Sequence, residues 1–223
     1  MQKLAFVMIA RNEQRCITRA LDSVRPYVDD MIVLDTGSTD DTVSFARNAG
    51  AKVFHFDWCD DFAKARNAAL DHSDADWNLI LDADEYLVSG GDSLKSIKTL
   101  KPDFVGALSI ESDFGSEAER QQAKNWLIRL LPASVRFIGR VHEQPAHQFP
   151  VKNLTIHCRH DGYLPMLRDQ KKGRNEYLLL TELNEKPDDP YLHYQLGKEK
   201  EVDGDFSNAL QAYRKSLLLI GSL

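Results

Sequence analysis

The chain has 223 residues, of which 43% are hydrophobic and 28% are charged. These fractions are near globular averages, and together with the length they predict one large domain with a smaller addition. The formal net charge of -6 excludes the basic surface typical of nucleic-acid binding, so we expect no nucleic-acid partner. No apolar run approaches the roughly 18 residues of a membrane span, and the first residues do not resemble a signal peptide.

The cysteines Cys16, Cys59 and Cys158 lie far apart and show no CxxC spacing. Their pattern indicates neither a disulfide framework nor a zinc site. We therefore expect a cytoplasmic protein, whose contact with the inner face of the membrane would be peripheral.

The first 90 residues alternate short apolar runs with amphipathic segments, a pattern typical of βαβ units on a parallel sheet. Strands are predicted at 4–10, 31–34, 52–56 and 77–81, with helices at 16–24, after 41 and at 62–72. Right-handed crossovers bring the strand-to-helix loops of such a sheet to one edge. Residues 11–13, Asp35 and residues 82–84 should therefore converge.

Between residues 105 and 156 the apolar runs have no well-spaced helices between them, which predicts an α+β half that completes the sheet. The chain then becomes helical and polar. The spacing of a tetratricopeptide helix pair is matched, in part, by Leu196, Gly197, Ala209, Tyr213 and Ser216. One pair cannot bury its own face, so this tail should pack on the first domain, pair with a second copy or continue in a longer chain. We place the domains at 1–165 and 166–223.

Three carboxylates follow the fourth predicted strand, in Asp82-Ala83-Asp84-Glu85. At the mouth of a buried strand they would repel one another and lose hydration unless a cation or hydrogen-bond donors compensate them. Mg²⁺ or Mn²⁺ can do so, held by one or two carboxylates and by phosphate oxygens of a substrate. The alternative interpretation is a helix N-cap with an acidic first turn, although a cap needs only one acid.

Asp35 ends a wholly apolar strand, where its carboxylate could bind a base N–H or ribose hydroxyls. It could instead cap the next helix, but Ser38 and Asp40 are better placed for that. No glycine-rich loop of the dinucleotide or P-loop type follows the first strand, which disfavours those ligands.

For the other candidate site residues, the sequence spacing by itself gives weaker support. Arg66, on an alanine-rich helix, could bind a phosphate or an active-site aspartate, or could be a solvated helix residue. Glu143 is the best candidate for a general base, although a surface His142-Glu143 pair is a more common arrangement. His157 and His160 could each bind a metal or be structural histidines.

Four ordered segments resemble the inverting family-2 glycosyltransferases of the GT-A fold: residues 6–13, 32–40, 56–67 and 82–85. Bacterial members with a trailing tetratricopeptide-like segment are particularly similar, among them lipopolysaccharide-core glucosyltransferases and peptide S-glycosyltransferases. The likeness covers residues 4 to about 165 well and the tail loosely. It implies an α/β fold with a Rossmann-like, mainly parallel sheet and flanking helices, followed by a small helical tail.

The resemblance also implies residue roles. Asp35 would bind the uridine, Arg66 would approach the sugar or diphosphate, and Asp84 would hold the metal. The nucleotide-sugar-binding residues would be Ala10, Arg11, Glu13, Asp35, Arg66, Asp82 and Ala83. A Gly-x-x-His-Glu segment of the family matches 139–143, which makes Glu143 the preferred catalytic base. A His-x-Gly-Tyr segment of the family matches residues 160–163, although Asp161 stands where an aromatic residue is usual. The match favours His160 over His157 as the histidine near the metal or the diphosphate.

We therefore expect metal-dependent, inverting transfer of a sugar in cell-envelope or glycoconjugate biosynthesis. The donor would be a nucleotide sugar, UDP-glucose or a related UDP-hexose, and the acceptor a saccharide, a lipid-linked saccharide or a peptide. The tail would favour homo-oligomers. Three alternatives stay open. A sugar nucleotidyltransferase would normally carry a glycine-rich loop after the first strand, a phosphatase would have its Asp-x-Asp on that strand, and a helical-repeat scaffold would use the acids only as a cap.

Overall fold

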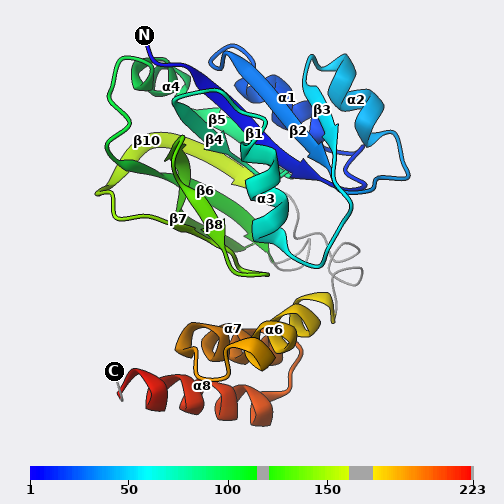
Figure 1. Ribbon diagram of the computed structural model, residues 1–223, viewed down its shortest axis with the longest axis vertical. Coiled ribbons are helices and arrows are strands. Elements are labelled where there is room, and N and C mark those ends of the chain that lie inside the picture. Colours follow the sequence, from blue (N-terminus) through cyan, green and yellow to red (C-terminus); the bar gives the residue numbers. More distant parts are fainter. Residues whose placement is uncertain (115–120, 161–172, 222–223) are drawn as a thin grey trace.

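The computed structural model describes residues 1–114, 121–160 and 173–221, and an eight-stranded sheet forms its centre (Figure 1). The strand order is β3-β2-β1-β4-β7-β6-β10-β5. These strands are β1 Leu4–Ala10, β2 Asp30–Asp35, β3 Lys52–His55, β4 Trp77–Ile80, β5 Glu85–Ser89, β6 Val105–Phe114, β7 Gln121–Pro132 and β10 Val151–His160. A separate hairpin contains β8 Arg136–Ile138 and β9 Gln144–Ala146. The helices are α1 Ile17–Val24, α2 Thr42–Asn48, α3 Phe62–Leu70, α4 Gly91–Ile97, α6 Arg174–Glu185, α7 Pro190–Val202 and α8 Phe206–Ile220.

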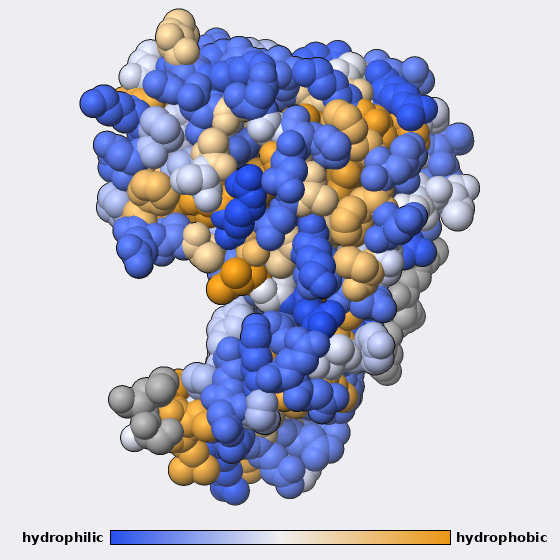
Figure 2. All heavy atoms as spheres, in the orientation of Figure 1, coloured by the Kyte–Doolittle hydropathy of each residue, from blue (hydrophilic) through white to orange (hydrophobic). Residues whose placement is uncertain are grey.

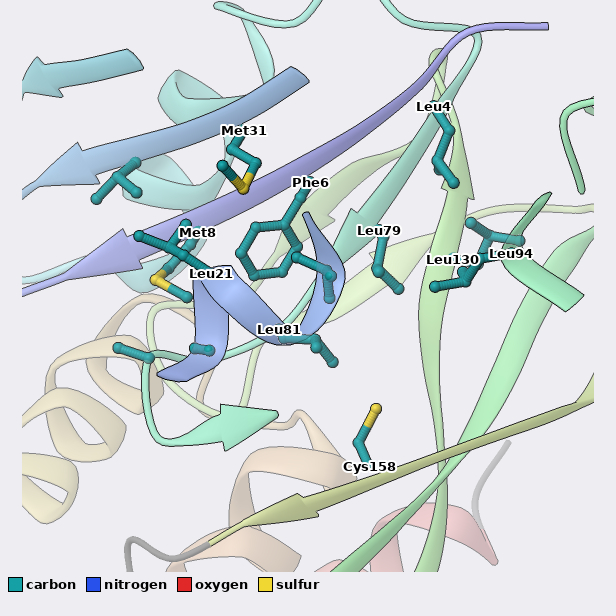
Figure 3. Close-up of a cluster of buried hydrophobic side chains, with 14 of the residues drawn as sticks. Leu4, Phe6, Met8, Leu21, Met31, Leu79, Leu81, Leu94, Leu130 and Cys158 are labelled. Carbon is teal, nitrogen blue, oxygen red and sulfur yellow. The ribbon is translucent and has the colours of Figure 1, made fainter. Parts of the chain in front are cut away.

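The parallel half of the sheet confirms the predicted βαβ pattern. Strands β1 to β4 pair in parallel, and β1 has the bounds that its apolar run predicts. Alternate residues of a strand point to opposite faces. Accordingly Phe6 and Met8 lie in one buried cluster with Leu21 of α1 (Figure 3), whereas Val7 lies in a second cluster beneath α3. A strand covered on both faces therefore needs the continuous apolar run that the sequence shows.

The second half of the sheet is mixed, as expected. Strand β7 pairs antiparallel with both β4 and β6, β6 pairs parallel with β10, and β5 forms the far edge. The mainly parallel α/β architecture is thus confirmed. The sequence pattern does not reveal β5, α4 or β9, because each is short and neither β5 nor β9 has a continuous buried apolar run.

Helices α6 to α8 lie together below the sheet domain in Figure 1, with α8 farthest from the sheet. Leu178 and Leu179 of α6 pack in one cluster with Val141, Trp58 and Phe62 of the sheet domain. The molecule narrows between the two parts (Figure 2). The expected boundary at 165/166 lies outside the described residues. No described helix is both long and apolar enough to cross a membrane.

Candidate active site

Arg66 of α3 occupies the centre of the candidate site. Asp61 caps the helix by accepting a hydrogen bond from Lys64 N at 2.9 Å. The alanines on the buried face bring the helix close to its neighbours, and Arg66 on that face is only 7% exposed. Its Nε donates to Glu143 Oε1 at 2.5 Å, and its Nη2 donates to Asp82 Oδ1 at 2.7 Å. One guanidinium therefore joins two of the predicted site carboxylates.

A second arginine, Arg129 of β7, extends this network. Its Nη2 donates to Asp82 Oδ2 at 2.9 Å and to Glu85 Oε1 at 2.7 Å. Burial by itself would raise the pKa of Asp82, but the charges and hydrogen bonds of Arg66 and Arg129 outweigh it and hold that pKa well below its usual value. For Glu85 burial dominates over Arg129, so its pKa is raised.

Hydrogen-bond donors, one of the two kinds of compensation expected for the acidic cluster, are present. Arg66 and Arg129 compensate Asp82, and Arg129 also compensates Glu85. Sequence analysis did not single out Arg129. The available signal was a charge within the otherwise apolar run 126–131, and such a charge inside a buried strand needs a partner.

Asp84 points instead to His160, the last residue of β10. His160 Nε2 lies 3.1 Å from Asp84 Oδ2, and His160 Nδ1 lies 3.4 Å from Ser112 Oγ. Burial would lower the pKa of His160, but the hydrogen bond and charge of Asp84 reverse this and raise it. No group of three or more potential metal ligands occurs among the described residues. The two predicted metal ligands, Asp84 and His160, lie side by side, and their role stays a prediction. His157 does not line the cavity described next, and residues 161–163 of the matched His-x-Gly-Tyr segment lie outside the described residues.

Several of these side chains line a cavity of about 900 Å³. The predicted site residues found in its wall are Ala10, Arg11, Glu13, Arg66, Asp82, Ala83, Asp84, Glu143 and His160. They come from the carboxyl ends of β1 and β4, from α3, from the β8–β9 loop and from the end of β10. The convergence expected from a parallel sheet is thus present.

Asp35 is the predicted site residue that does not line the cavity, although its neighbour Thr36 does. The Asp35 side chain is 3% exposed and accepts hydrogen bonds from Ser38 N at 3.1 Å and Gly37 N at 3.3 Å. These bonds fix the turn after β2. Its contact with uridine stays a prediction.

The helical tail supplies wall residues that sequence analysis missed. They are Gly173, Arg174, Asn175, Lys198, Glu199, Val202 and Asp203. Trp58 and Phe62, inside one of the motif segments, also line the cavity. No spacing in the tail could reveal this, because the relation between α6, α7 and the sheet domain exists only in three dimensions.

The chain belongs to glycosyl transferase family 2, whose profile matches residues 5–169. A TPR repeat-containing protein of Synechococcus elongatus is 33% identical over 97% of this chain and 57% of its own length. The prophage-derived glycosyltransferase SunS of Bacillus subtilis is 29% identical over 94% of this chain and 52% of its own length. The chain therefore spans a little more than half the length of these relatives.

Two solved structures that match about half of the chain contain UDP or UDP-glucose. One is glucosyl-3-phosphoglycerate synthase from Mycobacterium tuberculosis with Mn²⁺ and UDP-glucose. The match includes 49% of this chain and 44% of the synthase chain, at 25% identity and a TM-score of 0.41. TarS from S. aureus with UDP covers 51% of this chain and 37% of its own, at 24% identity and a TM-score of 0.43.

Proposed function

We propose that this protein transfers a hexose from a UDP-sugar to a saccharide, lipid-linked or peptide acceptor with inversion at the anomeric carbon. Membership of glycosyl transferase family 2 supports group transfer from a sugar donor. The observation that carries the proposal is the meeting of Asp84, Arg66 and Glu143 in one cavity of about 900 Å³, large enough for a nucleotide sugar.

Arg66 offers a donor to the substrate. Its Nη1 is buried and has no hydrogen-bond partner in the described part of the chain, whereas Nε and Nη2 hold Glu143 and Asp82. A buried donor without a partner is rare, and a functional site is one of the places where such donors occur. An oxygen of the donor diphosphate or sugar would satisfy it through a charge-assisted hydrogen bond.

The residues present fit a hard divalent ion. Asp84 would supply a carboxylate oxygen and His160 an imidazole nitrogen. The Nδ1 of His160 faces the hydroxyl of Ser112 and its Nε2 faces Asp84. Metal-binding histidines are commonly oriented in this way, by a hydrogen bond to the second ring nitrogen. Mg²⁺ or Mn²⁺ commonly takes one or two protein ligands and completes its shell with phosphate oxygens. When bound, such an ion would stabilise the negative charge that develops on the departing nucleoside diphosphate.

Glu143 would act as the base. Its carboxylate takes the proton of the acceptor hydroxyl or thiol while the acceptor atom attacks the anomeric carbon. The bond from that carbon to the diphosphate oxygen breaks on the opposite face, and the diphosphate leaves with the bonding electrons. The ion pair with Arg66 holds the carboxylate in one orientation in the cavity wall.

The proposal is tested by incubating the chain with a panel of nucleotide sugars, with and without Mn²⁺. We expect metal-dependent release of UDP from a UDP-hexose through slow donor hydrolysis, which needs no knowledge of the acceptor. The nucleotidyltransferase alternative predicts a different reaction, in which a nucleoside triphosphate and a sugar 1-phosphate yield a nucleotide sugar and pyrophosphate. Once an acceptor is found, proton NMR of the product reports the anomeric configuration.

The matched variants are Asp84→Asn and Asp92→Asn. Asp84→Asn should lower UDP release at least about 100-fold, because it weakens the metal site that stabilises the leaving group. Asp92 lies on α4 with a fully exposed side chain, so Asp92→Asn should leave the rate unchanged. If no nucleotide sugar is hydrolysed and UDP with Mn²⁺ does not raise the melting temperature, the proposal is wrong.

A further inference from the structure

The loop that carries Glu143, residues 139–143, is held from two sides. On the sheet-domain side, Phe62 N at the start of α3 donates to Arg140 O at 2.8 Å. On the tail side, Arg140 N donates to Glu182 Oε2 of α6 at 2.7 Å. Glu182 is a carboxylate only 3% exposed, and burying such a charge is costly unless it is paired. Its second oxygen accepts from Lys186 Nζ at 2.9 Å, so the carboxylate is paired on both oxygens.

His142, the residue before Glu143, has a φ of +52°, in the left-handed region that residues with a Cβ rarely adopt. Such a conformation persists only where its surroundings impose it. The carbonyl of His142 accepts from Tyr191 Oη of α7 at 3.0 Å and from Gln144 Nε2 at 3.1 Å. The Tyr191 hydroxyl also lies 3.1 Å from Gln144 Nε2, so the three groups form a closed triangle of contacts.

A second residue of α7 reaches the His142 ring. Glu199 Oε1 lies 3.3 Å from His142 Nε2, and this interaction is the main reason that the pKa of Glu199 falls below its usual value. The backbone of His142 is thus hydrogen-bonded to α7 and its ring lies against Glu199, while Arg140, two residues earlier, is hydrogen-bonded to α6.

We propose that the helical tail positions the catalytic base, with Tyr191 and Glu182 as positioning residues that act through Glu143. This inference rests on the proposed function, in which Glu143 accepts the acceptor proton. Arg66 orients the carboxylate of Glu143, and the tail fixes the strained backbone of the preceding residue, His142. Because rates are sensitive to shifts of about 1 Å in a reacting group, Tyr191 and Glu182 can control turnover although neither lines the cavity.

The kinetic test compares Tyr191→Phe with Tyr194→Phe in the full chain. Tyr191→Phe deletes the hydroxyl that holds His142, and kcat should fall about 3- to 10-fold with the affinity for UDP and the melting temperature unchanged. Tyr194, on the same helix, is 47% exposed and does not line the cavity, so Tyr194→Phe should behave as the unmodified protein.

A double-variant cycle distinguishes positioning from a general structural effect. If Tyr191 acts through Glu143, Tyr191→Phe should cause no further loss in a Glu143→Gln background. A fully additive loss would overturn the proposal. Glu182→Gln keeps an acceptor for Arg140 N and should retain most of the kcat that Glu182→Leu loses.

Amide hydrogen exchange tests the same link without enzyme activity. Exchange of residues 139–144 should become faster in Tyr191→Phe and in Glu182→Leu, and should stay unchanged in Tyr194→Phe. Unchanged exchange in both tail variants would overturn the tail's role. If exchange rises as expected while the unmodified protein hydrolyses no nucleotide sugar, the fault lies with the proposed function and the tail's hold on this loop stands.

Discussion

Arg66 Nε lies 2.5 Å from Glu143 Oε1, although 77 positions separate the two residues in the sequence. The same guanidinium binds Asp82, so the proposed base and the acidic motif after β4 share one cation. The planar fork of arginine can serve two carboxylates at fixed angles, whereas the ammonium of lysine is a point charge on a flexible stem.

Replacing Arg66 should therefore affect both stability and turnover. Arg66→Gln would leave Asp82 and Glu143 without this charge, and we expect a loss of about 2–3 kcal/mol in the free energy of unfolding. The estimate is below the full value for a buried pair because the Asp82 side chain is 36% exposed and also binds Arg129. Donor hydrolysis should fall at least about 100-fold. Urea denaturation and UDP release measure the two effects.

Two further variants control this experiment. Arg66→Lys keeps the positive charge but loses the planar guanidinium that binds two carboxylates. Compared with Arg66→Gln, it should restore more of the stability than of the activity. Arg136→Gln removes a half-exposed arginine that pairs with the exposed Asp71, and should change stability by less than about 0.5 kcal/mol. An Arg66→Gln protein as stable and active as the original would contradict the shared-cation arrangement.

The ion pairs of Asp30, far from the active site, should make the stability of the folded protein depend on pH. The hydrogen bond from Lys52 Nζ at 2.6 Å, together with Lys3, lowers the pKa of Asp30 in the folded state. A lowered folded pKa means that the pair stabilises the protein above the unfolded pKa of about 4, and that this contribution disappears as the pH falls below it.

Asp30→Asn should lower the free energy of unfolding by about 1 kcal/mol at pH 7. The effect is small because both lysine side chains are more than a third exposed, so that water screens the pairs. The difference from the unmodified protein should shrink toward zero between about pH 4 and pH 2. Urea denaturation across that range measures it, and a difference that grows on acidification would show the assignment to be wrong.

The three cysteines should differ in reactivity. Cys59 is exposed, while Cys16 and Cys158 are buried and their pKa values are raised by burial, that of Cys158 to about 12. The thiolate is the nucleophile, so iodoacetamide at pH 8 should label Cys59 alone in the folded protein and all three after unfolding. Mass spectrometry of the intact protein and its peptides counts and locates the labels. Rapid labelling of Cys158 in the folded state would contradict the burial of this side chain.

Gly197 tests the packing of the tail. A Cβ at this position would lie 2.5 Å from Tyr213 Cδ1, so α7 and α8 pack as closely as they do because the residue is glycine. Alanine normally stabilises a helix interior by up to about 1 kcal/mol relative to glycine. Here Gly197→Ala should instead destabilise by about 1–3 kcal/mol, measured as a lower melting temperature. In a Tyr213→Ala background the same change should cause no loss, and a loss there would show that the ring is not responsible.

Local patterns predicted the parallel half of the sheet well. The bounds of β1 agree with the prediction because a strand buried on both faces must be apolar throughout, and α1 follows from its helical spacing of apolar residues. β5 and α4 were not predicted because each is short and β5 has no continuous buried apolar run. The extent of β10 was also hidden, since its first three residues are exposed.

For this protein the sequence alone determined the family, the parallel sheet and the convergence of the predicted site residues on one cavity, because strand-to-helix loops of such a sheet must meet at one edge. Only the tertiary structure decided which charges pair: Asp82 with two arginines, Asp84 with His160, and Glu143 with Arg66. It alone also brought Tyr191 and Glu182 of the tail to the loop that carries Glu143. Ion pairs and hydrogen bonds act over a few ångströms in space, and residues that lie dozens of positions apart leave no local pattern that records their contact.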